Sequence, residues 1–143
     1  MALDFDEQPL SVISAAPELA REIEDRSAPM WVEEGVVLFR QGDPPGQVYY
    51  VKSGEIALTI RASGYVLMQA SAKAGSLLGL PSSVSNEPFT MTATTVRKAE
   101  ICRIDRAQFR DLMAENPQLH FNVLQILAAE VCAARKAMSK LLG

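Results

Sequence analysis

The sequence predicts an α+β domain that is mainly β: an antiparallel β-roll with a short helix before it and a long helix after it. Short apolar stretches alternate with glycine-bearing turns over residues 30–104, which is typical of many short antiparallel strands. The apolar spacing on both sides of this region is helical. The 143 residues, of which 48% are hydrophobic and 22% charged, are enough for one globular core and unlike a disordered chain.

The first helix is expected within residues 8–26, where Pro17 stands in a first turn and Glu18 lies near the positive end of the helix dipole. Eight apolar stretches are then expected as strands, and several alternate with period two, as in Glu55–Ile60. Because no linker or internal repeat interrupts the chain, we expect residues 1–143 to form a single domain, with the β-roll at about 30–104 and helices at about 105–142.

After the strands, Asp105 is expected to cap a short helix over residues 107–114. Pro117 then opens a long helix that runs to about Leu142. Two interpretations of this helix stay open, dimerisation through a heptad seam or docking on the chain's own roll. Residues that lie mostly off the seam (Leu119, Phe121, Val123 and Ile126) are expected to pack on the domain itself. The seam is formed by apolar positions spaced 3-4-3-4-3: Leu124, Leu127, Val131, Ala134, Met138 and Leu141.

Composition excludes several classes of function. The net charge is −3 and the 14 Lys and Arg residues are scattered, so we expect no direct nucleic-acid binding by this chain. No apolar run approaches the ~20 residues of a membrane-spanning helix, and the acidic N-terminus does not resemble a signal peptide. We therefore expect no membrane association and a cytoplasmic location.

The chain also lacks the residue sets that carry catalysis. It has no phosphate-binding Gly-Lys-Ser/Thr loop and no nucleophile with a neighbouring base and orienting group. Two cysteines, Cys102 and Cys132, are interpreted as small buried hydrophobic residues. With His120 as the one histidine, they cannot supply the four ligands of a structural zinc site. We expect no enzymatic activity and no metal site.

The most specific stretch runs from Glu34 to Leu58 and reads as strand, Gly-Asp-Pro turn, strand, glycine turn, strand. Asp43 can close an Asx-type turn there. The stretch closely resembles the cyclic-nucleotide-binding domain of the cyclic-AMP receptor protein / fumarate-nitrate regulator (Crp/Fnr) family. This likeness covers roughly residues 18–142 and implies a β-roll of the jelly-roll (double-stranded β-helix) type with a regulatory role. The residues that match the family pattern are Gly35, Leu38, Phe39, Gly42, Asp43, Tyr50, Val51, Gly54 and Ile56.

The resemblance places the ligand site in the cassette 79–91. Family members use a Glu there to accept a hydrogen bond from the ribose and an Arg to pair with the cyclic phosphate. This chain has Leu80 at the position of the Glu and Phe89 at that of the Arg, while Pro81 removes one backbone donor. A buried charge that loses its partner costs about 3–5 kcal/mol. Ordinary binding of cyclic AMP or cyclic GMP is therefore expected to be absent or very weak.

Two interpretations of the pocket stay open. Either Leu80 and Phe89 fill it, or it accepts another small-molecule effector, whose identity the sequence does not give. Four polar residues of the cassette have two possible roles: they either form hydrogen bonds with a polar ligand or cap a turn at the solvent-exposed surface. The second role is favoured for these residues, which are Ser82, Ser83, Ser85 and Asn86. Arg135 on the long helix either replaces the family's phosphate-binding Arg or lies in solvent. The solvent-exposed position is favoured. The candidate ligand-binding set is Gly79, Leu80, Pro81, Ser82, Ser83, Phe89, Thr90 and Arg135.

Full-length regulators of the resembled family continue past the long helix into a helix-turn-helix. This chain stops at Gly143, so we expect it to lack the DNA-binding part. Two explanations stay open: the chain is a stand-alone sensor, or it is a piece of a longer regulator. The favoured function is an effector-sensing module that signals through the C-terminal helix of a homodimer. The alternatives are the sensor half of a Crp/Fnr-type transcription regulator and a ligand-free dimerisation module.

Overall fold

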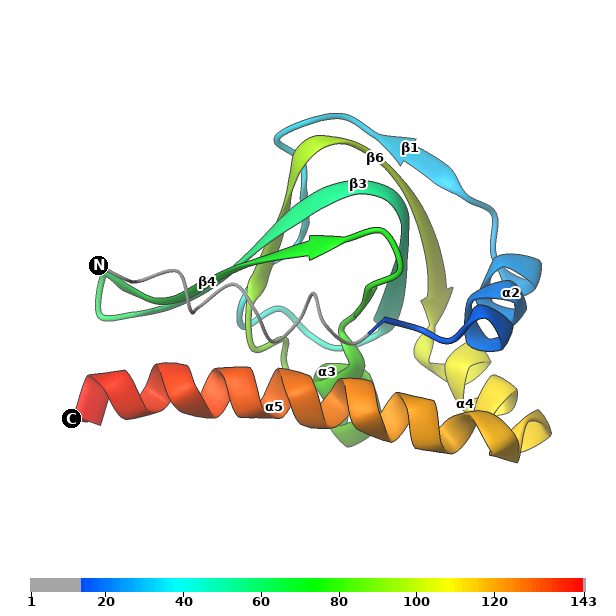
Figure 1. Cartoon of the computed structure of the whole chain (residues 1–143). Coiled ribbons are helices and arrows are strands. Elements are labelled where there is room, and N and C mark those ends of the chain that lie inside the picture. Colours follow the sequence, from blue (N-terminus) through cyan, green and yellow to red (C-terminus); the bar gives the residue numbers. More distant parts are fainter. Residues whose placement is uncertain (1–13, 143) are drawn as a thin grey trace.

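The computed structural model describes residues 14–142. In Figure 1 a bent sheet lies along one long helix, with two shorter helices at one end. The elements follow one another as α2 (Pro17–Arg26), β1 (Met30–Val32), β2 (Val37–Phe39), β3 (Gln47–Ala62), β4 (Tyr65–Lys73), β5 (Leu77–Leu78), α3 (Leu80–Ser85), β6 (Thr92–Asp105), α4 (Arg106–Glu115), the 3-10 helix η2 (Pro117–Leu119) and α5 (His120–Leu142).

The predicted antiparallel roll with flanking helices is confirmed. All paired strands are antiparallel, in the order β1-β6-β3-β4, with β2 on β6 and β5 on β3, and this path does not close into a barrel. In the described part of the chain the eight predicted stretches form six strands. The stretches at 48–51 and 56–60 are the two halves of β3, and β6 likewise joins two stretches. The reason is that both strands bend at register shifts without losing their pairing.

Gly54 makes the bend in β3 possible. Its φ is +96°, and a Cβ atom would lie 2.6 Å from the Ala99 Cβ atom and 2.8 Å from the Lys98 carbonyl oxygen. Only glycine fits a left-handed conformation with the neighbouring strand this close. The second glycine turn of the family motif is therefore a packing requirement of the roll.

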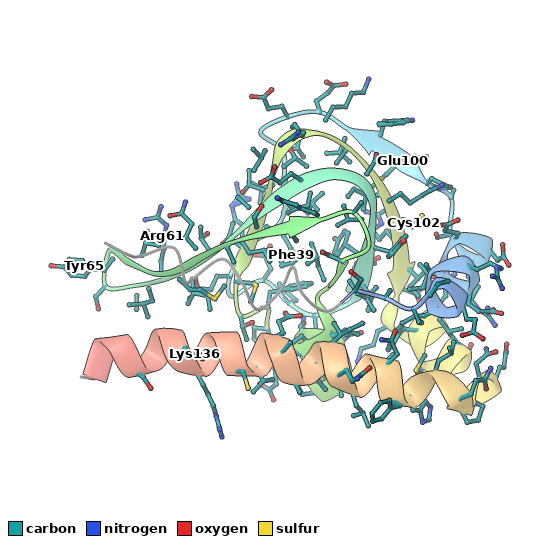
Figure 2. All side chains as sticks on the ribbon, in the orientation of Figure 1. Phe39, Arg61, Tyr65, Glu100, Cys102 and Lys136 are labelled. Carbon is teal, nitrogen blue, oxygen red and sulfur yellow. The ribbon has the colours of Figure 1, made fainter. Side chains whose placement is uncertain are left out.

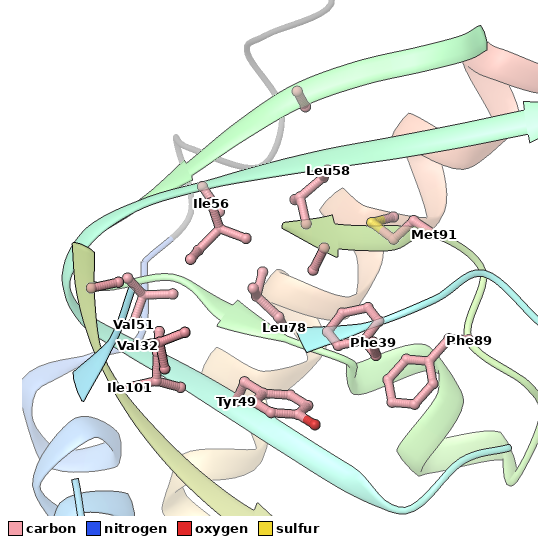
Figure 3. Close-up of a cluster of buried hydrophobic side chains, with 14 of the residues drawn as sticks. Val32, Phe39, Tyr49, Val51, Ile56, Leu58, Leu78, Phe89, Met91 and Ile101 are labelled. Atoms are coloured by element: carbon pink, nitrogen blue, oxygen red, sulfur yellow. The ribbon is translucent and has the colours of Figure 1, made fainter. Parts of the chain in front are cut away.

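Two clusters of buried apolar residues stabilise the domain. The first lies inside the bent sheet and contains the aromatic residues Phe39, Tyr49 and Phe89 (Figure 3). The second lies between the roll and the helices and includes Leu19 and Ile23 of α2 and Leu80 of α3. Helices α4 and α5 close this second cluster with Phe109, Leu112, Val123 and Ile126. The cassette thus contributes Phe89 and Met91 to the first cluster and Leu80 to the second.

The C-terminal helices pack on the domain itself as predicted, through Leu119 of η2 and through Val123 and Ile126 of α5. The prediction is wrong for Phe121, whose side chain is 70% exposed. Two residues after Leu119, it is turned by about 200° to the opposite side of the helix. No helix of the described residues is both long enough and apolar enough to cross a membrane.

The predicted seam is only partly on the open side of α5. Leu124 and Val131 are 59% and 42% exposed, whereas Leu127 is half-buried against the second cluster. The side chains of Ala134, Met138 and Leu141 lie outside the described part of the structure. The exposed side therefore follows a slightly rotated stripe that begins at Phe121.

Two local predictions have different outcomes. Asp105 caps α4 as expected: its Oδ1 accepts from the Gln108 amide at 2.7 Å, and the Gln108 side chain accepts from the Asp105 amide at 2.9 Å. Cys102 is fully buried as expected, but Cys132 is exposed. The prediction is wrong for Cys132 because this residue lies on the outer side of α5, away from the roll.

Candidate functional site: a degenerate ligand cassette

The Gly-Asp turn of the family motif holds the end of the cassette. Asp43 closes the turn, but not by the predicted Asx-type bond to the amide two residues further on. Its Oδ2 accepts from the Arg40 amide, three residues earlier, at 3.0 Å. The Phe89 amide then donates to the Asp43 carbonyl at 3.0 Å, and the Gly42 amide donates to the Phe89 carbonyl at 2.8 Å. A turn that is distant in sequence therefore fixes the backbone of Phe89 from both sides.

Gly79 opens the cassette with a sharp turn from β5 into α3. Its φ is +89°, and a Cβ atom would lie 2.9 Å from the Gln47 carbonyl oxygen and 3.1 Å from a ring carbon of Phe89. A side chain at this position would collide with backbone that cannot move away. The family glycine is thus retained here for a local reason that does not depend on a ligand.

The two positions that bind nucleotide in the resembled family point into the apolar core. Leu80 is fully buried in the second cluster. Phe89 is 6% exposed, and its ring stacks on Phe39 with centroids 4.1 Å apart and planes at 20°. Figure 3 shows the two rings together beside Tyr49. The place at which the resemblance implies a guanidinium and a phosphate is therefore occupied by packed aromatic side chains.

Two serines of α3 are placed differently from the favoured sequence interpretation. Ser82 and Ser83 are 2% and 4% exposed, and neither Oγ has a hydrogen-bond partner among the described residues. The surface-turn interpretation is wrong for this pair because α3 docks with these positions facing inward. It holds for Ser85, whose exposed hydroxyl donates to the Pro81 carbonyl at 2.6 Å, and for the exposed Asn86.

The remaining predicted residues lie nearer the surface. Pro81 is half-buried in the first turn of α3, and Thr90 is exposed at the end of the cassette. Arg135 is exposed on α5, as favoured from the sequence. Its neighbour Lys136 points away from the roll (Figure 2).

Sequence reasoning missed the cation that does contact the cassette. Arg106, the first residue of α4, donates from Nε to the Ser83 carbonyl at 2.6 Å. The contact joins residues 23 positions apart. The predicted cap at Asp105 places Arg106 in the first turn of α4, but no sequence signal shows that this turn faces α3.

Glu130 was also missed, although it lies on the inner side of α5. It is 3% exposed, its Oε1 has no hydrogen-bond partner among the described residues, and burial raises its pKa from 4.5 to about 8. The signal for its burial is its spacing, because it follows Ile126 by four residues and therefore shares its side of the helix. The buried side-chain atoms without a partner belong to Ser82 and Ser83 of α3 and to Glu130 of α5. Helices α3 and α5 also pack together.

Comparison with known proteins identifies the family. The model of the cyclic nucleotide-binding domain matches residues 29–116, which is more than half of the chain. The chain belongs to the cyclic nucleotide-binding domain family. This match covers the roll, the cassette and α4, and it confirms the resemblance found in the sequence. It also places the chain in a family of binding domains, not of catalytic ones.

Relatives and solved structures extend the likeness. The transcriptional activator protein Anr of Pseudomonas aeruginosa is 28% identical over 124 residues, which are 86% of this chain and 50% of Anr. The chain therefore spans about half the length of that relative. The Thermus thermophilus catabolite activator protein superposes with a TM-score of 0.74 at 24% identity, covering 94% of this chain and 63% of that one. The global regulator CLP of Xanthomonas campestris gives 0.69 at 18% identity, covering 86% and 63%. Both structures show the same fold.

Proposed function

We propose that this chain is a non-catalytic regulatory module that senses an effector other than a conventionally bound cyclic nucleotide and signals through α5. One observation carries the proposal: the Phe89 ring stacks on Phe39 inside the roll, where the family places its phosphate-binding Arg. A phosphate seated there would lose its hydration without gaining a cation. The chain keeps the fold of a sensor, but apolar side chains occupy the two positions that recognise a cyclic nucleotide.

The packing of the cassette supports a route to α5. Leu80 of α3 shares the second cluster with Val123 and Ile126 of α5. A ligand that favours one position of α3 would therefore repack the same apolar contacts that hold α5 on the roll. Such a ligand shifts the position of α5 only by its difference in affinity for the two arrangements. An effector other than a mononucleotide also has a parallel on this fold, since CLP is a c-di-GMP-responsive global regulator.

The open side of α5 supports a homodimer. Phe121, Leu124 and Val131 are 70%, 59% and 42% exposed, and Ala128 between them is exposed as well. Their 3-4-3 spacing is that of a coiled-coil seam. Fully burying each large side chain against a second copy contributes about 1.5–3 kcal/mol. The proposed interface uses this rotated stripe, with Leu124 and Val131 in common with the predicted seam.

Calorimetric titration of the purified chain with cyclic AMP and cyclic GMP tests the cassette. We expect no binding at micromolar concentrations, because both recognition side chains are apolar and buried. A cyclic-AMP-binding member of the family, titrated under the same conditions, provides the positive control. Micromolar affinity of this chain for either nucleotide would refute the proposal.

Sedimentation equilibrium tests the dimer. The variant Leu124→Glu should shift the population to monomer at concentrations at which the wild type is dimeric, because it places a charge in the centre of the seam. Val96→Glu is the matched control, since Val96 is 44% exposed on β6 and not on α5. Equal dissociation of the two variants, or a wild type that is monomeric at every concentration, would remove α5 as the interface.

Two other functions have support of their own. The similarity to Anr favours the sensor half of a transcription regulator, and the reading frame beyond residue 143 tests it, because that function requires a helix-turn-helix there. The filled cassette favours a ligand-free dimerisation module. Thermal-shift measurements with nucleotides, haem and organic acids distinguish it from a sensor, since a sensor is stabilised by its effector.

A further inference from the structure

A groove separates the cassette helix α3 from α4 and lies outside the first core cluster. Its volume is about 180 Å3, and its lining residues are Ser83, Val84, Arg106, Phe109, Arg110 and Met113. This is more space than a single water needs and enough for one small organic molecule. Phe109 is 5% exposed and gives the groove an apolar wall, while Val84 is 52% exposed at its rim.

Two arginines give the groove a positive charge. Arg106 and Arg110 are four residues apart on α4 and therefore lie on the same side of this helix. Among residues 14–142 neither guanidinium has a carboxylate within 4 Å, and the one bond found for Arg106 runs from Nε to the Ser83 carbonyl. Two like charges at this spacing repel each other, so an anion between them is favoured.

Ser83 positions one of the two arginines at the groove. Its carbonyl oxygen accepts from Arg106 Nε at 2.6 Å, which leaves the terminal N–H groups of this guanidinium without a bond among the described residues. The Ser83 Oγ atom itself is buried out of contact with solvent, so a molecule in the groove does not reach it. Guanidinium groups recognise carboxylate and phosphate through paired N–H donors.

We propose that the α3–α4 groove binds a small amphipathic anion, a carboxylate or phosphate ester with an apolar body of about one ring. The acid group lies between Arg106 and Arg110 and accepts from their guanidinium N–H groups, and the body packs on Phe109 and Met113. This site is distinct from the family's nucleotide position and does not rest on the proposed function. Because its wall is made of α3 and of α4, an occupant would tie the cassette helix to the helix that leads into α5.

Amide NMR titration with phenyl phosphate tests the site. Inorganic phosphate tests the acid group alone, benzyl alcohol tests the apolar body alone, and benzoate tests whether a carboxylate serves as well as a phosphate. We expect saturable shifts at Ser83, Val84 and Arg110 with phenyl phosphate, and at least tenfold weaker binding of inorganic phosphate and of benzyl alcohol. Benzoate binding at the same residues would assign the shared anion chemistry, and its failure would restrict the site to phosphate esters.

Variants decide between a built site and general surface charge. Arg106→Gln and Arg110→Gln should each weaken phenyl phosphate binding by about tenfold or more, the value of a hydrogen bond to a charged group. Arg61→Gln is the matched control, because this substitution removes the same charge at a distant place. Arg61 lies on the β3–β4 hairpin, far from α4 (Figure 2). Ser83→Ala is a second control and should leave phenyl phosphate binding unchanged, since the hydroxyl that it removes is buried out of reach of the groove.

The proposal is overturned by any of three results: no saturable shift at millimolar phenyl phosphate, equal binding of benzyl alcohol, or unchanged affinity in both arginine variants. Circular dichroism of each variant distinguishes lost binding from lost structure. If Arg106→Gln unfolds because it loses the bond to the Ser83 carbonyl, the exposed Arg110 still provides the test.

Discussion

Replacing Glu130 by glutamine should make the chain more stable at neutral and alkaline pH and remove much of the pH dependence of its stability. The side chain is 3% exposed on the inner side of α5, and its Oε1 lacks a hydrogen-bond partner among the described residues. Desolvation by burial raises its pKa from 4.5 to about 8. Glutamine has nearly the same shape and cannot ionise, so the variant tests the charge and leaves the packing in place.

The sign follows from proton linkage. Between pH 4.5 and pH 8 the native carboxyl holds a proton that the unfolded carboxyl has lost, so the free energy of unfolding falls as the pH rises through this window. The stabilisation that the protonated Glu130 provides is therefore fully present below pH 4.5 and lost above pH 8. A shift from 4.5 to about 8, at 1.36 kcal/mol per pKa unit, corresponds to about 5 kcal/mol. This is a large part of the 5–15 kcal/mol by which domains are usually stable.

Urea unfolding of the wild type and of Glu130→Gln at pH 5, 6, 7 and 8 measures the effect. The two curves should nearly coincide at pH 5 and separate as the pH rises, with the variant more stable by several kcal/mol at pH 8. Glu34→Gln, which replaces an exposed carboxylate, should follow the wild type throughout. Parallel curves for the wild type and Glu130→Gln would mean that Glu130 reaches solvent or a partner, and the reasoning from burial would be wrong.

Three further substitutions test the framework around the site, each by urea unfolding. Phe89→Ala should cost about 3–5 kcal/mol, because it empties the stack on Phe39; a cost below 1 kcal/mol would mean that the ring is not packed. Gly54→Ala should cost at least about 2 kcal/mol, since its Cβ atom would lie 2.6 Å from the Ala99 Cβ atom at a φ of +96°. Asp105→Ala should cost about 1 kcal/mol through loss of the α4 cap, and Asp105→Ser should recover most of it.

The sequence was sufficient for the order of the elements because their signals are local. Period-two stretches and glycine turns predicted the strands, and Asp105 marked the start of α4. Pro117 was expected to open the long helix, but it opens the 3-10 helix η2, and α5 begins three residues later at His120. It was insufficient for the number of strands, because a strand that bends at Gly54 leaves the same gap in the pattern as a strand that ends there. Whether pairing with β6 continues through the gap depends on residues more than 40 positions away.

The sequence predicted which recognition residues the candidate site lacks, but it did not predict the contacts that the substituted residues make. Leu80 and Phe89 could be aligned with the missing recognition residues, and both interpretations of the pocket followed from that alignment. That Phe89 stacks on Phe39, or that Arg106 contacts Ser83, depends on how separate elements dock. The direction in which a short helix such as α3 turns its serines is likewise a tertiary property, because six residues give too little periodicity.

The location of the unpartnered polar atoms also bears on signalling. Within residues 14–142, Ser82, Ser83 and Glu130 hold the buried side-chain atoms without a hydrogen-bond partner, and they lie on α3 and α5, which pack together. Each such group costs about 1–3 kcal/mol, so these unfavourable terms lie on the cassette helix and on the helix that we propose as its output. The sheet core beside them is apolar and closely packed. Elements with low local stability are the ones that move at small free-energy cost, and a ligand that satisfies one of these groups would bias α3 and α5 with little change in the roll.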